Sequence, residues 1–166
     1  LKLRNLIVLP ILILTVITSP IAVSSDSAEL ISKDTFVLEQ ALMMGQGITT
    51  DGEYYYTSGA IAGIGLTFLA KFTVEEMELV TVSMNPLPDK CEDRRNDHIG
   101  GISFYDGKIY ASVEGPDEGY PCIVVFDAET LECTDEVYDL PYEIFDDGVP
   151  WCAVDNETGY LYTSKW

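Results

Sequence analysis

Basic residues are scarce in this sequence of 166 residues, because 9 Lys and Arg stand against 28 Asp and Glu, and the formal net charge is −19. No basic cluster is longer than the pair Arg94-Arg95. A surface this acidic repels phosphate backbones and anionic lipids. The composition therefore excludes nucleic acid as the expected partner. Since 47% of the residues are hydrophobic and only 22% are charged, we expect a folded chain.

Familiar catalytic and metal-binding motifs are also absent. The chain has no Gly-x-Ser-x-Gly elbow and no His-Glu-x-x-His pair, so neither a standard serine hydrolase nor a zincin is indicated. It has no Cys-x-x-Cys pair for zinc and no Asp-x-Asp-x-Asp-Gly loop for calcium. The glycine-rich segment 59–65 precedes a predicted strand, whereas a nucleotide loop requires a helix there. These absences favour a protein without catalytic residues.

The N-terminus has the order of a secretory signal peptide. Lys2 and Arg4 precede the apolar run from Leu6 to Ile17, and small and polar residues follow up to a cleavage site that we place after Ser24. Residues 1–24 are therefore predicted to be a signal peptide, and the mature chain is expected to be secreted or periplasmic, without insertion into a membrane. The alternative is a retained N-terminal membrane anchor.

The four cysteines form an even set in a chain predicted to be exported, which indicates disulfides. We favour Cys122 with Cys133, because they lie on the two arms of one predicted hairpin. That choice leaves Cys91 with Cys152. The other connectivities and a partner outside this chain remain open.

A β-hairpin occurs three times in the sequence. Tyr56, Tyr110 and Tyr162 occupy equivalent positions 54 and then 52 residues apart. Each copy follows a turn that contains Asp and Gly, and a short apolar segment precedes that turn. The copies are 54–58, 108–112 and 160–164.

A second hairpin repeats in the same register, because residues 70–80 align with 124–134. Two hairpins per repeat make four antiparallel strands of about five residues each. Repeats of this length with four strands are typical of β-propeller blades. A β-sandwich is the alternative, but it would not repeat a four-stranded unit in register.

The predicted fold class is therefore all-β, an incomplete β-propeller with about two and a half blades. Since known rings have typically four to eight blades, we expect the chain to be a fragment of a larger protein. The predicted parts are an N-terminal segment with an outer closing strand (25–45), one blade (46–97), a second blade (99–150) and the first hairpin of a further blade (151–166).

Acidic residues gather in the loops that a propeller would present on one face. His98 is the only histidine, and Asp97 beside it could orient it, so His98 is a candidate for that ligand-binding face. Asp97, Glu114 and Asp147 are candidate ligands for Ca²⁺, which prefers carboxylate and carbonyl oxygens. Solvated surface charge is the alternative explanation. Asn156 begins an Asn-x-Thr glycosylation sequon in a predicted turn.

The repeated strand, Asp-Gly turn and Tyr-Thr/Ala-Ser pattern resembles extracellular propellers of the YVTN, NHL and gluconolactonase-like group. The segment Val125-Phe126-Asp127-Ala128-Glu129-Thr130-Leu131 is similar to the turn between strands in many YVTN-type blades. The resemblance covers residues 46–166 and implies architecture only. Members of this group include binding scaffolds, calcium-dependent lactonases and quinoprotein-like redox enzymes.

Two functional hypotheses follow, with a third that rests on the fold alone. The first is a secreted, non-catalytic binding or scaffolding module for a protein or carbohydrate ligand. The second is a calcium-dependent lactonase or hydrolase that uses the three candidate carboxylates. The third is a quinoprotein-like redox propeller.

Overall fold

The computed structural model describes residues 45–61, 65–115 and 120–166. The predicted signal peptide (1–24) and the N-terminal segment with its closing strand (25–45) lie outside the described residues, apart from Gly45. The described ranges contain ten strands and one short helix, so the predicted all-β class is confirmed for them. None of their helices is both long and apolar enough to cross a membrane.

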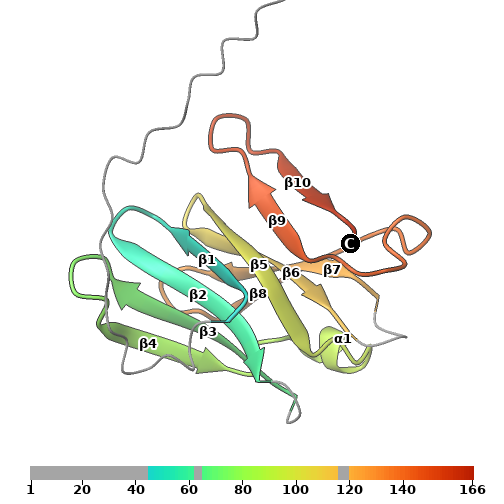
Figure 1. The fold of residues 1–166 in the computed structure, drawn as a ribbon, viewed down its shortest axis with the longest axis horizontal. Coiled ribbons are helices and arrows are strands. Elements are labelled where there is room, and N and C mark those ends of the chain that lie inside the picture. The colour runs from blue at the N-terminus through green and yellow to red at the C-terminus, as the bar shows by residue number, and fades with distance from the viewer. Residues whose placement is uncertain (1–44, 62–64, 116–119) are drawn as a thin grey trace, which may run out of the picture. The chain divides into compact units, whose positions relative to one another are not determined.

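Two four-stranded antiparallel sheets account for most of the strands, and each follows the chain order (Figure 1). The first sheet consists of β1 (Gly47–Thr50), β2 (Tyr54–Ile61), β3 (Leu66–Thr73) and β4 (Leu79–Met84). The second sheet consists of β5 (His98–Tyr105), β6 (Lys108–Glu114), β7 (Cys122–Asp127) and β8 (Cys133–Asp139).

Two further elements lie outside these sheets. A hairpin of β9 (Trp151–Val154) and β10 (Leu161–Ser164) pairs antiparallel at the C-terminal end. The short helix α1 (Asp89–Glu92) connects the two sheets. The predicted all-β fold contained no helix at this position. One four-residue helix is too short to produce a visible apolar period of 3.6 residues.

The repeat appears in the backbone as well as in the sequence. In each first hairpin, the tyrosine pairs with the same position of the preceding strand: Thr49–Tyr56, Ser103–Tyr110 and Ala153–Tyr162. In the second hairpins, Met77 and Leu131 are both buried and adopt positive φ angles of 55° and 60°. Few non-glycine residues adopt this left-handed conformation, so its recurrence 54 residues later shows that the same turn is built twice.

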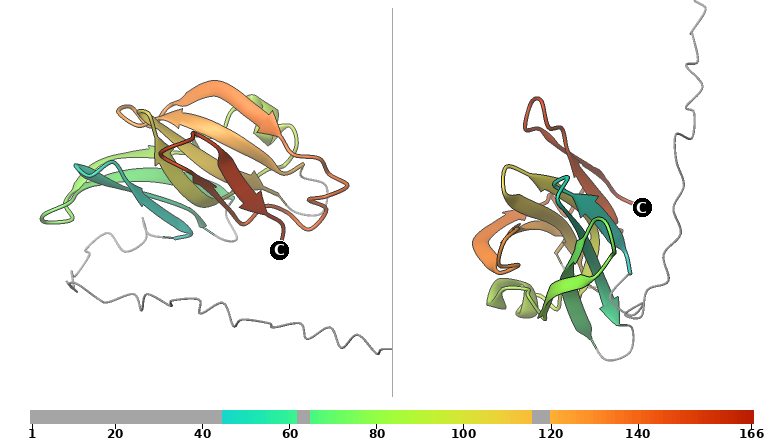
Figure 2. Two further views of the ribbon diagram at one scale, coloured as in Figure 1. Left: turned by 90° about the horizontal axis from the view of Figure 1, so that it is seen from above. Right: turned by 90° about the vertical axis from the view of Figure 1, so that its left-hand side faces the viewer.

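Strand β5 connects the second sheet, to which it belongs, with the first sheet and the C-terminal hairpin. It packs against β1 and β2 of the first sheet and against β9 of the C-terminal hairpin, as both sets of ribbon views show (Figures 1 and 2). Hydrogen bonds cross both boundaries: Ser58 Oγ donates to Gly100 O over 2.6 Å, and Gly101 N donates to Pro150 O over 3.0 Å.

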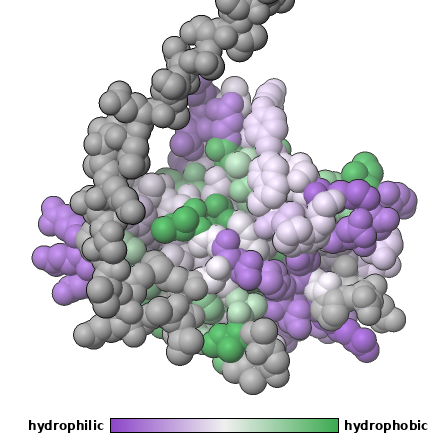
Figure 3. All heavy atoms as spheres, viewed as in Figure 1, coloured by the Kyte–Doolittle hydropathy of each residue, from purple (hydrophilic) through white to green (hydrophobic). Residues whose placement is uncertain are grey.

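The core is divided by the second sheet. One cluster fills the space beside the first sheet and includes Cys122, Val124 and Phe126 of β7. A smaller cluster lies toward the C-terminal hairpin and includes Ile123 of the same strand together with Cys152. Side chains of a strand alternate between its faces, so neighbours in β7 serve different cores. Hydrophilic side chains gather at the ends of the sheets, including those over the β3–β4 turn (Figure 3).

Candidate functional site

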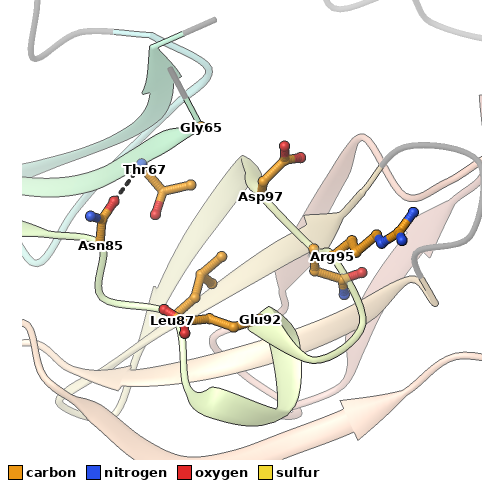
Figure 4. Close-up of a pocket in the computed structure, with 8 residues that line it drawn as sticks. Gly65, Thr67, Asn85, Leu87, Glu92, Arg95 and Asp97 are labelled. Atoms are coloured by element: carbon orange, nitrogen blue, oxygen red, sulfur yellow. Dashed lines mark hydrogen bonds between the residues drawn. The ribbon is translucent and has the colours of Figure 1, made fainter. Parts of the chain in front are cut away.

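A cavity of about 280 Å³ opens between the beginning of β3 and the β4–β5 connection. The β4–β5 connection contains Asp97, one of the residues predicted for the ligand-binding face. Figure 4 shows Thr67 and Asn85 on one side of the cavity and Arg95 on the other, with Asp97 and Glu92 also around it. The described residues that line it are Gly65, Thr67, Asn85, Leu87, Glu92, Arg95, Asn96 and Asp97.

The wall formed by the first sheet is fixed by a reciprocal contact. Asn85 N donates to Thr67 O over 2.8 Å, and Thr67 N donates to Asn85 Oδ1 over 3.1 Å. Asn85 adopts a positive φ of 50°, a conformation that asparagine tolerates better than most residues. The side-chain oxygen of Asn85 is therefore already used as an acceptor.

The opposite wall contains Asn96, a buried side chain whose amide oxygen has no hydrogen-bond donor among the described residues. Asn96 is 2% exposed, and its Nδ2 donates to Tyr120 O over 2.8 Å and lies 3.5 Å from Cys122 Sγ. Its Oδ1 is buried and accepts no hydrogen bond from any described residue. A buried oxygen in this state costs free energy, so it marks a position where a donor is missing.

An ion-pair cluster holds α1, and with it Glu92 of the cavity, against the end of β8. Lys90 Nζ lies 3.1 Å from an Asp139 carboxylate oxygen, and the guanidinium of Arg94 contacts both oxygens of that carboxylate. The hydrogen bond from Arg94 is the main reason why the pKa of Asp139 is lowered. These ion pairs position α1 beside the second sheet.

The three carboxylates predicted to bind Ca²⁺ have separate surroundings. Asp97 lines the cavity. Glu114 Oε2 accepts a 2.6 Å hydrogen bond from Val149 N, and Asp147 lies 3.7 Å from Lys165 Nζ. Within residues 45–61, 65–115 and 120–166, no group of three or more His, Cys, Asp or Glu side chains is arranged to hold a metal ion. The described structure thus assigns different neighbours to each predicted ligand.

The two remaining candidate residues, His98 and Asn156, do not line the cavity. His98 is the first residue of β5, is partly buried and lies opposite Glu114 in the strand register. It is not among the residues that line the cavity. Asn156 is exposed in the turn between β9 and β10, where the glycosylation sequon predicted it.

The arrangement of the cysteines differs from the favoured pairing, which stays a prediction. Cys122 lies opposite Asp139 in the β7–β8 register and Cys133 lies opposite Phe126, so the expected partners are offset along the hairpin. Cys91 and Cys152 belong to the two different cores. The sulfur close to Cys122 is that of Cys91, at 3.9 Å, and all four side chains are free thiols in this structure.

Asn96 is the residue that the sequence analysis missed. The adjacent Asp97 and His98 were predicted instead, because carboxylates and imidazoles titrate and bind metals. A buried amide carries no such signal in a single sequence. Only its position after a short helix, which the sequence did not indicate either, places it in the cavity wall.

The sequence matches no protein-family model, and a search of curated proteins finds no significant relative. The case for a function therefore rests on the cavity and on the arrangement of the sheets.

Proposed function

We propose that this chain is a segment of a β-propeller from an exported protein and that it acts as a non-catalytic binding module. Two four-stranded sheets and a further hairpin, arranged in chain order around β5, support the propeller. The predicted signal peptide, residues 1–24, supports export. The ligand binds in the cavity between the beginning of β3 and the β4–β5 connection.

The observation that carries this proposal is the set of polar side chains around one cavity. Glu92 and Asp97 supply acceptors, and Arg95 supplies a positive charge. An arrangement of carboxylates, side-chain amides and a guanidinium around one cavity suits a ligand rich in hydroxyl groups, so we assign carbohydrate as the ligand class.

The size and charge of the site narrow the ligand. A cavity of about 280 Å³ is at the lower end of small-molecule sites, and it accommodates one sugar residue rather than a long chain. The net charge of −19 disfavours acidic sugars. We therefore expect a neutral sugar or an amino sugar, bound as a free sugar or as the end of a glycan.

The test applies the labelled full chain to an array of neutral, amino and acidic glycans. We expect binding to neutral or amino glycans, which is then measured by calorimetry with the corresponding monosaccharide. Glu92→Gln and Asp97→Asn should each weaken binding about tenfold, because each removes a charged acceptor. Asp93→Asn is the matched control, since Asp93 is exposed next to Glu92 and does not line the cavity.

Two results would overturn the proposal. One is an array on which no glycan binds, or binding that neither cavity variant weakens. The other is turnover of a lactone or ester that disappears in Asp97→Ala or His98→Ala. The second result would move the chain to the hydrolase class.

A further inference from the structure

We propose that Cys91 and Cys122 are the site of an intramolecular disulfide that ties α1 to the beginning of β7. Their sulfurs lie 3.9 Å apart, and both residues are 0% exposed. A disulfide requires about 2.0 Å between the sulfurs, so a small shift of two side chains brings them to bonding distance. This cross-link is independent of whichever ligand occupies the cavity.

The surrounding structure already holds the two residues together. Arg94 and Lys90, on either side of Cys91, are bound to Asp139, which lies opposite Cys122 in the sheet. Asn96 contacts both cysteines, because its backbone N–H donates to Cys91 O over 2.9 Å while its Nδ2 lies 3.5 Å from Cys122 Sγ. The pair is therefore placed by several contacts other than the thiols themselves.

The other thiols have no comparable neighbour among the described residues. Cys133 is partly buried and lies opposite Phe126, further along the β7–β8 hairpin than Cys122. Cys152 lies in the core on the other side of the second sheet, where its sulfur is 3.3 Å from Tyr110 O. We therefore assign one disulfide to the chain and leave Cys133 and Cys152 as thiols.

The disulfide forms by thiol–disulfide exchange, in which a cysteine thiolate attacks the disulfide of an oxidant. Either Cys91 or Cys122 can act as the attacking thiolate, because neither is the fixed donor in their contact. The oxidant is itself a disulfide, either the cystine of an oxidoreductase or oxidised glutathione.

The reaction balances in two exchange steps. One of the two cysteines attacks, as its thiolate, one sulfur of the oxidant, forms a mixed disulfide and expels one thiol of the oxidant. The other cysteine then loses its proton, attacks the cysteine sulfur of the mixed disulfide and expels the second thiol. Two electrons pass to the oxidant, and the two protons of the cysteines end on its thiols. Because both sulfurs are fully buried in the fold, this exchange occurs before α1 covers Cys122.

The test refolds the reduced full chain with a mixture of oxidised and reduced glutathione, blocks free thiols with iodoacetamide and maps the peptides by mass spectrometry. We expect one disulfide, Cys91 to Cys122, with Cys133 and Cys152 recovered as alkylated thiols. A dominant Cys122–Cys133 or Cys91–Cys152 peptide would overturn the assignment, as would recovery of all four cysteines in the alkylated form.

A second measurement uses stability and does not depend on the peptide map. Dithiothreitol should lower the urea midpoint of the oxidised chain, and it should have no effect on the Cys122→Ser variant. Cys133→Ser is the matched control, because Cys133 packs against the same core, and this variant should keep the full effect of the reductant. An unchanged midpoint for the oxidised chain would contradict the proposal.

Discussion

The backbone N–H of Phe104 donates a 3.0 Å hydrogen bond to Thr49 Oγ1, which joins the second sheet to the first. The same contact recurs one repeat later, where Val154 N donates to Ser103 Oγ over 2.9 Å. Thr49 and Ser103 are equivalent positions, each opposite the repeated tyrosine of its hairpin. A hydroxyl at this position therefore connects β1 to β5 and β5 to β9.

This connection predicts the effect of removing the hydroxyl. Ser103→Ala and Thr49→Val should each lower the free energy of unfolding by about 1 kcal/mol, because each leaves a partly buried N–H without its acceptor. Urea unfolding followed by tryptophan fluorescence measures the loss. Thr49→Ser keeps the acceptor and serves as the control. Equal stability of Thr49→Val and Thr49→Ser would show that the hydrogen bond contributes nothing.

Close packing between the sheets predicts that Gly47 cannot be enlarged. A Cβ at Gly47 would lie 2.8 Å from Ile102 N and 2.9 Å from Gly100 O, both backbone atoms of β5. Gly47→Ala should therefore push the sheets apart and cost about 1–3 kcal/mol. In amide NMR spectra, we expect the largest shifts at Gly100 and Ile102.

Gly52→Ala is the matched control for this effect. Gly52 has a φ of +93° and no atom within 4 Å of an added Cβ, so alanine strains only the turn between β1 and β2. Its amide shifts should stay within that turn. Large shifts in β5 from Gly52→Ala, or none from Gly47→Ala, would contradict the packing argument.

Asp127 predicts a specific dependence of stability on pH. Its Oδ1 accepts hydrogen bonds from the backbone N–H groups of Thr130 and Glu129 at 2.8 and 3.0 Å, and the N–H of Thr130 is the main cause of its lowered pKa. The folded pKa lies below the unfolded value, so the charge stabilises the protein above that value of 3.8. The contribution is lost as the pH falls through the folded pKa.

Asp127→Asn isolates this charge because asparagine can keep the turn. The variant should be less stable than the original chain near neutral pH, by less than about 1 kcal/mol since the group is largely exposed. The difference should shrink toward zero below pH 3.8. Urea midpoints measured from neutral to acidic pH provide the test. A difference that stays constant over this range would show that the charge has no role.

The sequence predicted the elements that repeat and missed those that do not. Tyr56 and Tyr110 revealed the register of the hairpins because strands and turns are local patterns that recur at a fixed spacing. Helix α1 occurs once and has only four residues, so neither periodicity nor repetition indicated it. Residues of that helix and of the segment after it line the cavity. The sequence therefore indicated a face for ligand binding but did not indicate the cavity itself.

The cysteine pairing shows a second limit. Cys122 and Cys133 are neighbours on one hairpin in the sequence, yet a register that pairs Cys133 with Phe126 separates them. The sulfur close to Cys122 comes from Cys91 of helix α1, 31 residues earlier in the chain. Contacts between distant segments depend on tertiary packing, which no local pattern in a single sequence reveals.

The ion pairs of Asp139 predict a local rather than a global effect. Asp139→Asn should weaken the attachment of α1, which Lys90 and Arg94 provide, and should increase amide exchange over residues 89–96. The global loss should be below about 1 kcal/mol, because Lys90 and Asp139 are exposed to solvent and Arg94 is only partly buried. Asp93→Asn is the control, and it should leave the exchange unchanged. Equal exchange in Asp139→Asn and the original chain would mean that the ion pairs do not anchor the helix.

Glu114 provides a prediction that separates a structural role from calcium binding. Its Oε2 accepts hydrogen bonds from Val149 N at 2.6 Å and from Trp166 Nε1 at 3.3 Å, so the carboxylate holds the end of the β8–β9 connection. Glu114→Ala should cost about 1–2 kcal/mol because it leaves Val149 N without an acceptor. Exposed Glu143 in the same connection is the control, and Glu143→Ala should cost little.

Calcium titration then distinguishes the two roles of Glu114. If these hydrogen bonds are its function, addition of Ca²⁺ should leave the emission of Trp166 and the melting temperature unchanged, because the oxygen is already held by two N–H donors. Binding of Ca²⁺ would have to displace those donors and would alter the environment of the indole. A rise in the melting temperature with Ca²⁺ that Glu114→Ala abolishes would make the carboxylate a metal ligand.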